Sequence, residues 1–493
     1  MRQEFNIKES IIYQVWKDQN FKKTFQTQEG IEIVVLDCGT LNDQLAGPDF
    51  LNARVRIGNI TYVGDIEIDI AYTDWKAHGH NIDSKYSKVV LHATLINKIN
   101  QDSVYTRDGR KIPSICLSDY IDKKIINDLH SYNEDDSGNN TSSLKCSSAL
   151  HSLENKNVND FLVQMGIQRF ERKRNKIYQR LKELQFLEEL GIKEPVISYE
   201  LSPKFHEKEF SFTDFNSPMV WKQLLYEQIF DALGYNKNRT QMFELAKNLD
   251  IKTLQQIEKD GTIIEKYEAA LFKVSGLFPE SLQNYDIEER KYWERLNLHW
   301  ASIQPFYDSK FLPEEKWNFF RLRPQNFPTV RLAGGARMIN EIINNNMIEV
   351  IIKKVNEIIN LNVLIGSLRS VFIVKSSGYW KSHFIAGKET SKDLNYFIGA
   401  SRADEIVINI ILPFLSIYFD VYGNKKLSQK VMKVYSVYAQ TIDNKIVSDI
   451  ADILSLQNEL NRTIITQGIL ELFRSLCSKN KCLECEIGRQ VFN

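Results

Sequence analysis

The sequence predicts a small α/β unit followed by a larger, mainly helical unit. Residues 1 to about 115 begin with one amphipathic segment and continue as short, β-branched runs, which are typical of strands. From about residue 145 onward, apolar residues recur at helical spacing. The two patterns are separated by SYNEDDSGNNTSSL, which is almost free of apolar residues. We therefore expect a domain at 1–130, a linker at 131–144 and a helical domain at 145–493.

The N-terminal unit is expected to open with a helix and to continue as a sheet. In the longest expected strand, Ile66, Ile68 and Ile70 share one face, so Asp65, Glu67 and Asp69 share the other. The polar segment 74–88 can hold a helix. The expected helix covers 4–19, and the expected strands cover 31–36, 51–57, 60–72 and 89–96, with a Gly–Asn turn at 58–59.

The helical unit shows several long periodic segments and no repeat of steady period. Its longest apolar run, 406–419, has 14 residues, too few to span a bilayer, and polar residues interrupt it. The expected helices cover 161–190, 218–233, 240–274, 338–360 and 425–475.

Composition describes an ordinary globular chain. Its 493 residues include 63 basic and 63 acidic side chains, so a nucleic-acid site would have to be a local basic patch. The N-terminus, MRQEFNIKES, lacks the apolar core of a signal peptide. Three of the six cysteines fall within nine residues, which fits one metal site in a reducing compartment better than a disulfide framework. We therefore expect a cytoplasmic protein without a membrane segment.

Carboxylates recur around two expected strands. Asp49 stands just before the strand 51–57, and Glu67 and Asp69 lie two residues apart on the next. Adjacent strands are about 4.8 Å apart, so Asp49 and Glu67 can share one Mg²⁺ or Mn²⁺ ion, with Asp69 as a further ligand. Such an ion can activate water for attack on a phosphodiester. The alternative is that the acids face solvent on an exposed sheet face.

Histidines gather directly after these acids, in DWKAHGH. His78 and His80 can bind metal, contact a phosphate or act as a general acid, or they can belong to a solvated loop. His92, on the following strand, is more typical of a hydrogen-bonded core histidine. Lys76, in the same segment, can contact a substrate phosphate.

The order helix, strand, acid, strand with Glu-x-X, helix, strand resembles the core of the PD-(D/E)XK nuclease superfamily. That resemblance implies a restriction-endonuclease-like fold in which Asp49 and Glu67 hold the metal. Asp69 stands where the superfamily has Lys, and an acid cannot stabilise a phosphate as Lys does. Either Lys76, Lys85 or Lys88 supplies the cation, or the site is inactive.

A second resemblance extends along nearly the whole chain. The segments AGPDFLNARV, GDIEIDI, DWKAHGH and VVLHATL resemble the bacterial domain-of-unknown-function family 2851, as do RLRPQNFPTVRLA and CSKNKCLECEIG further on. In that family the position of Asp69 is usually His. The resemblance implies no established activity.

Three cysteines close the chain with metal-ligand spacing. Cys477, Cys482 and Cys485 form Cx4CxxC, which offers three thiolates to a 4Fe–4S cluster or a Zn²⁺ ion. The family resemblance places a cysteine at Cys146, the best fourth ligand. The metal would then join the two ends of the helical domain, unless the clustering is fortuitous.

Two arginine-rich segments invite comparison with phosphate sites. Arg321, Arg323 and Arg331 surround a Pro-broken helix start, where they can bind phosphate or pair with acids between helices. A second basic run, 169–180, includes acids and is more typical of a solvated helix face.

The sequence thus favours a metal-dependent nuclease acting on DNA or RNA. Asp49, Glu67 and Asp69 would hold the metal, and His78 or His80 would contact the phosphate. The alternatives are an inactive nucleic-acid binder of the same fold and a helical scaffold with a structural metal site. Protein partners are not indicated.

Overall fold

The computed structural model confirms the predicted class, a mixed N-terminal sheet followed by a mainly helical region. The chain divides into two compact units, residues 1–140 and 141–493. The expected linker 131–144 lies outside the described residues. Those residues are 9–17, 19, 24–27, 30–42, 47–99, 101–120, 155–191, 205, 208–235, 237–283, 285–320, 322–440, 444–479 and 481–492.

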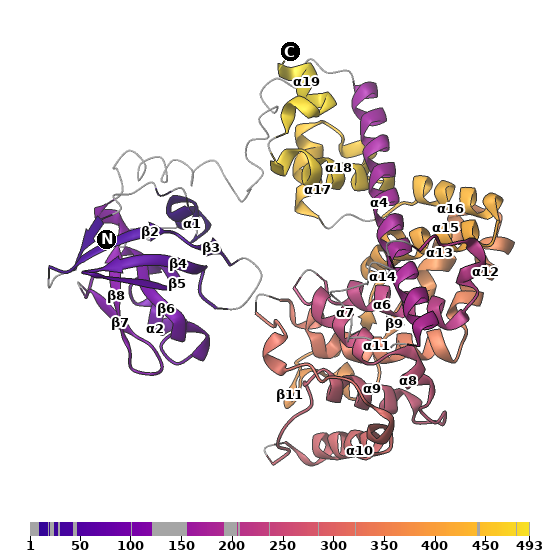
Figure 1. Cartoon of the computed structure of the whole chain (residues 1–493), viewed down its shortest axis with the longest axis horizontal. Coiled ribbons are helices and arrows are strands. Elements are labelled where there is room, and N and C mark those ends of the chain that lie inside the picture. The colour runs from indigo at the N-terminus through magenta and orange to yellow at the C-terminus, as the bar shows by residue number, and fades with distance from the viewer. Residues whose placement is uncertain are drawn as a thin grey trace. The chain divides into compact units, whose positions relative to one another are not determined.

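The N-terminal unit is built on one eight-stranded mixed sheet (Figure 1). Its strand order is β1-β2-β4-β5-β6-β8-β7, and β3 pairs with β4. The strands are β1 (Thr24–Gln26), β2 (Glu32–Asp37), β3 (Thr40–Leu41), β4 (Phe50–Ile57), β5 (Ile60–Ala71), β6 (Val89–Ile96), β7 (Ser103–Tyr105) and β8 (Lys111–Cys116).

The centre of this sheet changes from antiparallel to parallel pairing at β5. The hairpin β4–β5 turns at Gly58, whereas β5 pairs in parallel with β6, and β6 with β8. Gly64 lies where β5 meets the start of β6. A Cβ there would come within 2.4 Å of the Val90 side chain, so only glycine permits this approach.

Both faces of the central strands are covered. On one face, Ile66 and Ile68 pack in a core with Trp16 of α1 (Glu9–Lys17). On the other, Trp75 of α2 (Asp74–Ala77) and Tyr86 of the short 3-10 helix η1 (Ser84–Lys88) form a second cluster. The expected helix over 74–88 is therefore two short helical turns, within the connection that joins parallel strands.

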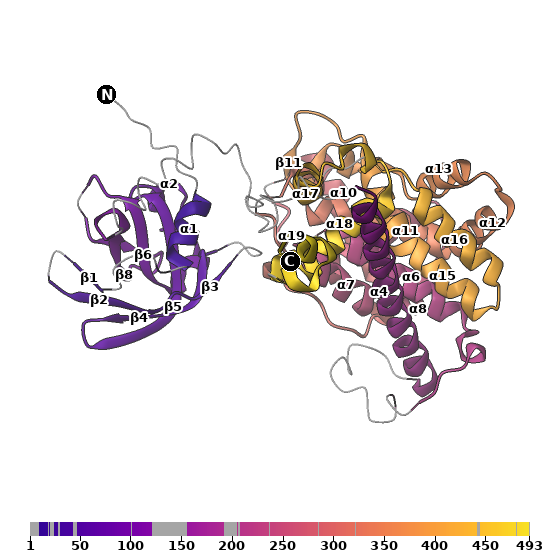
Figure 2. The ribbon, with the colours of Figure 1, turned by 90° about the horizontal axis from the view of Figure 1, so that it is seen from above.

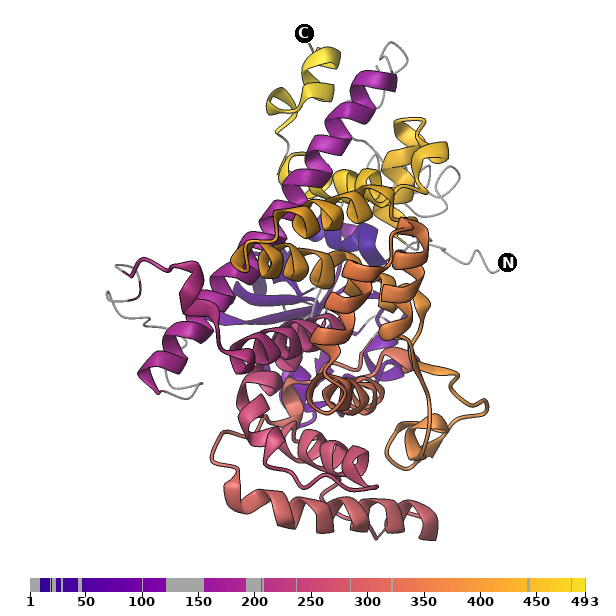
Figure 3. The same cartoon turned by 90° about the vertical axis from the view of Figure 1, so that its right-hand side faces the viewer.

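The helical unit contains one helix much longer than the rest. Figures 2 and 3 show α4 running past the other helices, and it packs against α18, α15 and α6. Its helices are α4 (Asn155–Leu190), α6 (Pro218–Leu233), α7 (Arg239–Asn248), α8 (Ile251–Gln255), α9 (Ile263–Val274), α10 (Ile287–Ile303), α11 (Pro328–Ile343), α12 (Met347–Glu357), α13 (Leu361–Val371), α14 (Ala400–Ile406), α15 (Leu412–Val421), α16 (Lys425–Val437), α17 (Lys445–Ile453), α18 (Thr463–Ser475) and α19 (Glu486–Phe492). Short strands β9 (Val374–Lys375), β10 (His383–Ile385), β11 (Lys388–Glu389) and β12 (Tyr396–Ile398) form two small sheets.

The tightest helix contact joins α4 and α18. A Cβ at Gly166 would come within 2.3 Å of the Ile464 carbonyl oxygen, and one at Gly468 within 2.1 Å of the Leu162 carbonyl oxygen. The two backbones approach this closely because both positions lack a side chain.

Several predicted helices are divided. The range 240–274 contains α7, α8 and α9, because Asp250 caps a new helix by accepting a hydrogen bond from the Thr253 N–H. The range 338–360 is broken before Asn346, which adopts a left-handed conformation at φ 49°. Capping and turn residues interrupt periodic patterns that are otherwise continuous in sequence.

The apolar run 406–419 lies inside the helical core. It forms the end of α14, a π-helical segment (Val407–Ile411) and most of α15, and nearly all of it is buried. None of the helices in the described part of the chain combines the length and apolarity that a bilayer crossing requires.

Candidate functional site

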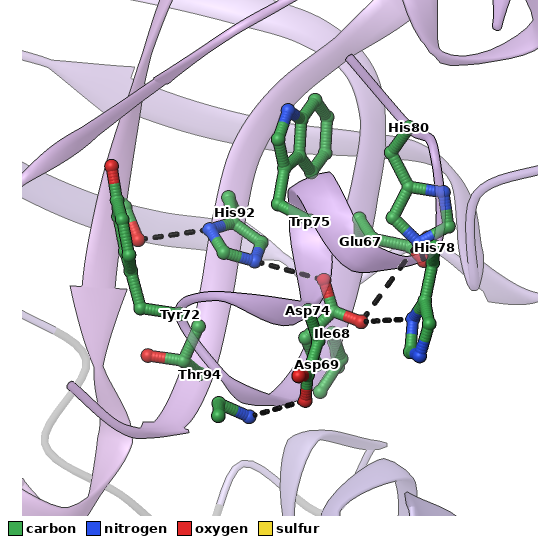
Figure 4. A network of polar contacts seen from close by, with 12 residues as sticks. Glu67, Ile68, Asp69, Tyr72, Asp74, Trp75, His78, His80, His92 and Thr94 are labelled. Carbon is green, nitrogen blue, oxygen red and sulfur yellow. Dashed lines mark hydrogen bonds and ion pairs between the residues drawn. The ribbon is translucent and has the colours of Figure 1, made fainter. Parts of the chain in front are cut away.

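The candidate site lies on the α2 side of the central strands (Figure 4). The register of the strands places three of its side chains on one face of the sheet. Glu67 pairs with His92, and His92 pairs with Ser114. Asp69 pairs with Thr94 in the next row on the same face. The side chains of Glu67 and Asp69 are only 6% and 2% exposed. The alternative that these acids face solvent is therefore wrong, because α2, η1 and the loop between them cover this face.

The histidine loop after α2 brings imidazoles onto the acids (Figure 4). His78 Nδ1 lies 3.1 Å from Asp69 Oδ1, and His80 Nε2 lies 3.8 Å from the same oxygen. His80 Nε2 is also 3.0 Å from Glu67 Oε1, as an ion-pair contact that is poorly aligned for a hydrogen bond. The side chain of His80 is 9% exposed, whereas that of His78 is 46% exposed. The site is thus closed around His80 and reaches solvent at His78.

His92 holds the other oxygen of Asp69. Its Nε2 lies 3.1 Å from Asp69 Oδ2, and its Nδ1 lies 2.9 Å from Ser114 Oγ. Burial lowers the pKa of His92, so the ring is neutral, donating from Nε2 to the carboxylate and accepting from the Ser114 hydroxyl. This confirms the prediction of a hydrogen-bonded core histidine and leaves Asp69 Oδ1 directed toward His78 and His80.

Asp49 is tied into the site through its backbone and its own carboxylate. Its N–H donates to Glu67 Oε2 at 3.1 Å. Its carboxylate accepts from the Tyr13 hydroxyl at 2.6 Å and from the Ile68 N–H at 3.0 Å. The structure thus brings Asp49 beside Glu67, as the sequence predicts, but both of its oxygens already accept hydrogen bonds. Tyr13, 36 residues away on α1, carried no signal in the sequence.

Aromatic rings form the walls. Tyr86 lies against His80 with ring centroids 4.1 Å apart, and Trp75 contacts both His80 and His92 at 5.5 Å and 5.2 Å. Burial, with the nearby carboxylates of Glu67, Asp49 and Asp69, raises the pKa of Tyr86, so its hydroxyl stays protonated. These walls lower the local dielectric and strengthen every charge interaction inside the site.

Burial and neighbouring charges shift the pKa values of Glu67, Asp69 and His80. Burial raises the pKa of Glu67 to about 8, and the neighbouring Asp49 and Asp69 charges act in the same direction. Burial opposes the charge on Asp69, but the imidazoles of His80 and His92 outweigh it and hold the pKa of this carboxyl well below its usual value. Burial also lowers the pKa of His80, and the two carboxylates more than compensate, raising it to about 9. A protonated His80 is thus the cation that balances Asp69 here.

Asp69, His78 and His80 could hold a metal ion. Among the described residues they are the one set of three His, Cys, Asp or Glu whose ligand atoms all lie within 4.8 Å of one another. Ligands at about 2.1 Å around a tetrahedral ion are roughly 3.4 Å apart, and the Asp69 oxygen lies 3.1 Å and 3.8 Å from the two nitrogens. Two imidazoles with carboxylates suit Zn²⁺ or Mn²⁺ better than Mg²⁺.

The remaining predicted site residues lie elsewhere or are not described. Lys76 is exposed on α2. Arg323 is exposed, whereas Arg331 is buried on α11 and donates to Tyr235 Oη and Asn326 Oδ1, both at 2.6 Å. Arg321 lies outside the described residues.

The C-terminal cysteines fall in consecutive short turns after α18. Cys477 lies in a 3-10 turn, Cys482 begins another, and Cys485 ends it by donating its N–H to the Cys482 carbonyl at 3.2 Å. In the part of the chain that is described, these three sulfurs do not form a set within 4.8 Å. Cys146 lies outside the described residues, so a four-cysteine cluster stays a prediction.

Comparison with known proteins bears on the chain as a whole. No curated protein and no solved structure gave a significant match. A family profile matches residues 9–190 and 201–444, which span both units. The chain therefore belongs to the family described as protein of unknown function (DUF2851).

Proposed function

We propose that the N-terminal unit is a divalent-metal-dependent phosphodiesterase acting on DNA or RNA. One observation carries this proposal. The buried carboxylate of Asp69 meets two imidazoles, His78 and His80, and the buried Glu67 contacts His80, at a site that reaches solvent at His78. In the metal-free protein a protonated His80 balances Asp69, and a bound ion would take over this role and release the His80 nitrogen as a ligand.

The residues divide the work in a definite way. Asp69, His78 and His80 hold the ion, with Glu67 beside them, and Mn²⁺ or Zn²⁺ suits this donor set. The bound ion supplies Lewis acidity and lowers the pKa of a bound water. His92 and Asp49 act as positioning residues, since His92 orients Asp69 and the Asp49 N–H orients Glu67.

A phosphodiester is the proposed substrate because of the order of elements. Acid, strand, Glu-x-X strand, helix and strand follow one another as in the PD-(D/E)XK nucleases. Asp69 takes the position of their Lys, so the cation that faces the phosphate must come from elsewhere. We assign this role to Lys76, an exposed side chain of α2 that makes no ion pair among the described residues and stands two residues before His78.

Cleavage assays on the full chain test this proposal. Single- and double-stranded DNA and RNA, together with bis-p-nitrophenyl phosphate, are incubated with Mn²⁺, Zn²⁺ or Mg²⁺ after removal of metal by EDTA. We expect Mn²⁺- or Zn²⁺-dependent cleavage that Glu67→Gln and His80→Asn reduce at least 100-fold. Glu32→Gln is the matched control, because Glu32 is an exposed acid of the same sheet that pairs with Arg56.

An inactive nucleic-acid binder is the second candidate, favoured by Asp69 at the position of the expected Lys. It predicts nucleic-acid binding without cleavage under any of the three metals. Neither cleavage nor binding by a folded, metal-loaded protein would refute both candidates.

A further inference from the structure

The helical unit contains a cavity of about 710 Å³, open to solvent on one side, between α4, α6, α14 and α18. This volume falls within the range of small-molecule sites, roughly 300–1,000 Å³. Seven of its lining side chains are Lys or Arg, and only two, Asp231 and Glu405, are acids. The basic run at 169–180 was expected to be a solvated helix face; Arg172 and Lys176 are exposed, and four basic side chains of the run line this cavity.

Lys173 is the deepest of these cations. Its ammonium donates to the amide oxygens of Asn409 and Gln467, the latter at 3.1 Å, and no carboxylate among the described residues lies within ion-pair distance. Burial lowers the pKa of Lys173 well below its usual value, and the neighbouring Arg169 acts in the same direction. The side chain still exposes surface, because it faces the cavity. The Glu405 carboxylate on the cavity wall acts on the pKa of Lys173 in the opposite direction without reaching ion-pair distance, so an anion in the cavity would supply the closer counter-charge.

The other basic side chains of the cavity fall into two groups, those that pair with an acid and those that do not. Arg169 and Arg172 both pair with Glu471, and Arg239 pairs with Asp231. Three further cations, Lys176, Arg402 and Arg474, line the cavity without any acid within 4.0 Å in the described part of the chain. With Lys173, four basic side chains on three helices therefore face one space without an ion-pair partner among the described residues.

The wall at Arg402 is held by a strained residue. Tyr235 has φ 52°, a left-handed conformation that is costly for a bulky side chain. Its ring contacts two guanidinium groups, with Arg402 3.3 Å and Arg331 4.6 Å from the ring centroid. Arg331 also donates to the Tyr235 hydroxyl. Arg331, which was predicted to contact phosphate, thus contacts Tyr235 of the cavity lining and does not line the cavity itself.

Helix α14 continues into the π-helical segment Val407–Ile411, which also lines the cavity. Asn409 lies in this segment, where its side chain accepts from Lys173 and donates to Glu405 Oε2 at 2.5 Å. Single π turns inside α-helices are rare and are found frequently at functional sites. The Asn409 amide in this segment thus bridges Lys173 and Glu405.

We infer that this cavity binds a small ligand carrying several phosphate groups, such as a polyphosphate chain, free or within a nucleotide. Guanidinium and ammonium groups on several helices match closely spaced phosphate oxygens. A single carboxylate or phosphate would leave most of these cations uncompensated. The cavity lies entirely within residues 141–493, so the inference does not depend on the proposed function of the N-terminal site.

Titration calorimetry on the full chain tests the inference with inorganic tripolyphosphate, orthophosphate and ATP as probes. We expect tripolyphosphate to bind at least tenfold more tightly than orthophosphate. Arg474→Gln and Lys176→Gln, both exposed and without an acidic partner, should each weaken tripolyphosphate binding about tenfold or more. Lys353→Gln is the matched control on α12, because this exposed lysine lies outside the cavity and should leave binding unchanged. Circular dichroism verifies the fold of each variant.

The outcomes separate the possible sources of the phosphate chain. ATP binding more tightly than tripolyphosphate would support a nucleotide, and equal binding would support the inorganic chain. Absence of tripolyphosphate binding, or binding that Arg474→Gln and Lys176→Gln leave unchanged, would overturn the inference. A 12-nucleotide single-stranded DNA that displaces tripolyphosphate and binds more tightly would overturn it in favour of a nucleic-acid surface.

Discussion

Replacement of His92 isolates the contact that orients the proposed metal ligand. His92→Phe keeps a ring in the buried space but removes the donor to Asp69 Oδ2, now 3.1 Å away, and the contact with Ser114. Loss of an outer hydrogen bond to a metal ligand typically costs 10–100-fold in metal affinity, or about 1.4–2.7 kcal/mol. In metal-free protein, loss of a bond to a buried carboxylate costs about 1.5–3 kcal/mol of stability.

The assay is Mn²⁺ and Zn²⁺ titration by calorimetry, with urea unfolding of EDTA-treated protein in parallel. His92→Gln is the matched control, because its amide nitrogen can occupy the position of Nε2 and restore the donor. We expect the Phe variant to bind metal 10–100-fold more weakly and the Gln variant to recover most of that loss. Unchanged metal affinity in a folded His92→Phe protein would refute the positioning role assigned to His92.

Three further predictions concern helix packing, a buried ion pair and proton binding. Gly468→Ala should destabilise the helical unit by about 1–3 kcal/mol in urea unfolding, because the added Cβ would overlap the α4 backbone. Gly366→Ala is the control: its Cβ would lie in open space on α13, and it should stabilise the unit by up to about 1 kcal/mol. Arg180→Met should lower the free energy of unfolding by about 3–5 kcal/mol in the same assay, because it leaves the fully buried Glu227 without its bidentate partner at 2.8 Å and 2.9 Å. The double variant Arg180→Met/Glu227→Leu should regain most of this stability. Thermal unfolding of EDTA-treated protein at several pH values should show the contribution of His80 complete below pH 6.5 and lost by pH 9, because its pKa rises from 6.5 to about 9 on folding. His80→Asn should remove this part of the pH dependence and leave the part due to Glu67, whose pKa rises from 4.5 to about 8; a pH dependence that is the same in His80→Asn as in the unmodified protein would contradict the assignment.

The local elements of the N-terminal unit follow from short-range patterns. Strand β6 has the predicted bounds, and β4 and β5 differ from prediction by one residue at an end, because alternation and the Gly58 turn are local properties. Alternation of side chains along β5 is also sufficient to predict that Glu67 and Asp69 share one face. The helix over 74–88 was overpredicted, since its polar pattern describes exposure more than helicity.

Which groups meet in the site depended on pairing between distant strands. Asp69 was predicted to share a metal with Asp49 and Glu67, but the parallel register of β5, β6 and β8 gives it His92 as a partner. The loop after α2 then folds His78 and His80 back onto it. Such contacts depend on the path of the chain in space, which spacing alone does not contain.

By itself the sequence determined the two-part organisation, the central strands and the acid and histidine types that make a metal site plausible, because these depend on local periodicity and side-chain chemistry. Only the tertiary structure decided which side chains converge. It buried Glu67 and Asp69 under α2 and η1, and it gathered cations from α4, α14 and α18 around one cavity. A basic helix face has the same periodicity in sequence whether its side chains lie on an open surface or line a cavity. The packing of helices almost 300 residues apart made the difference, as in the contact of Lys173 with Gln467.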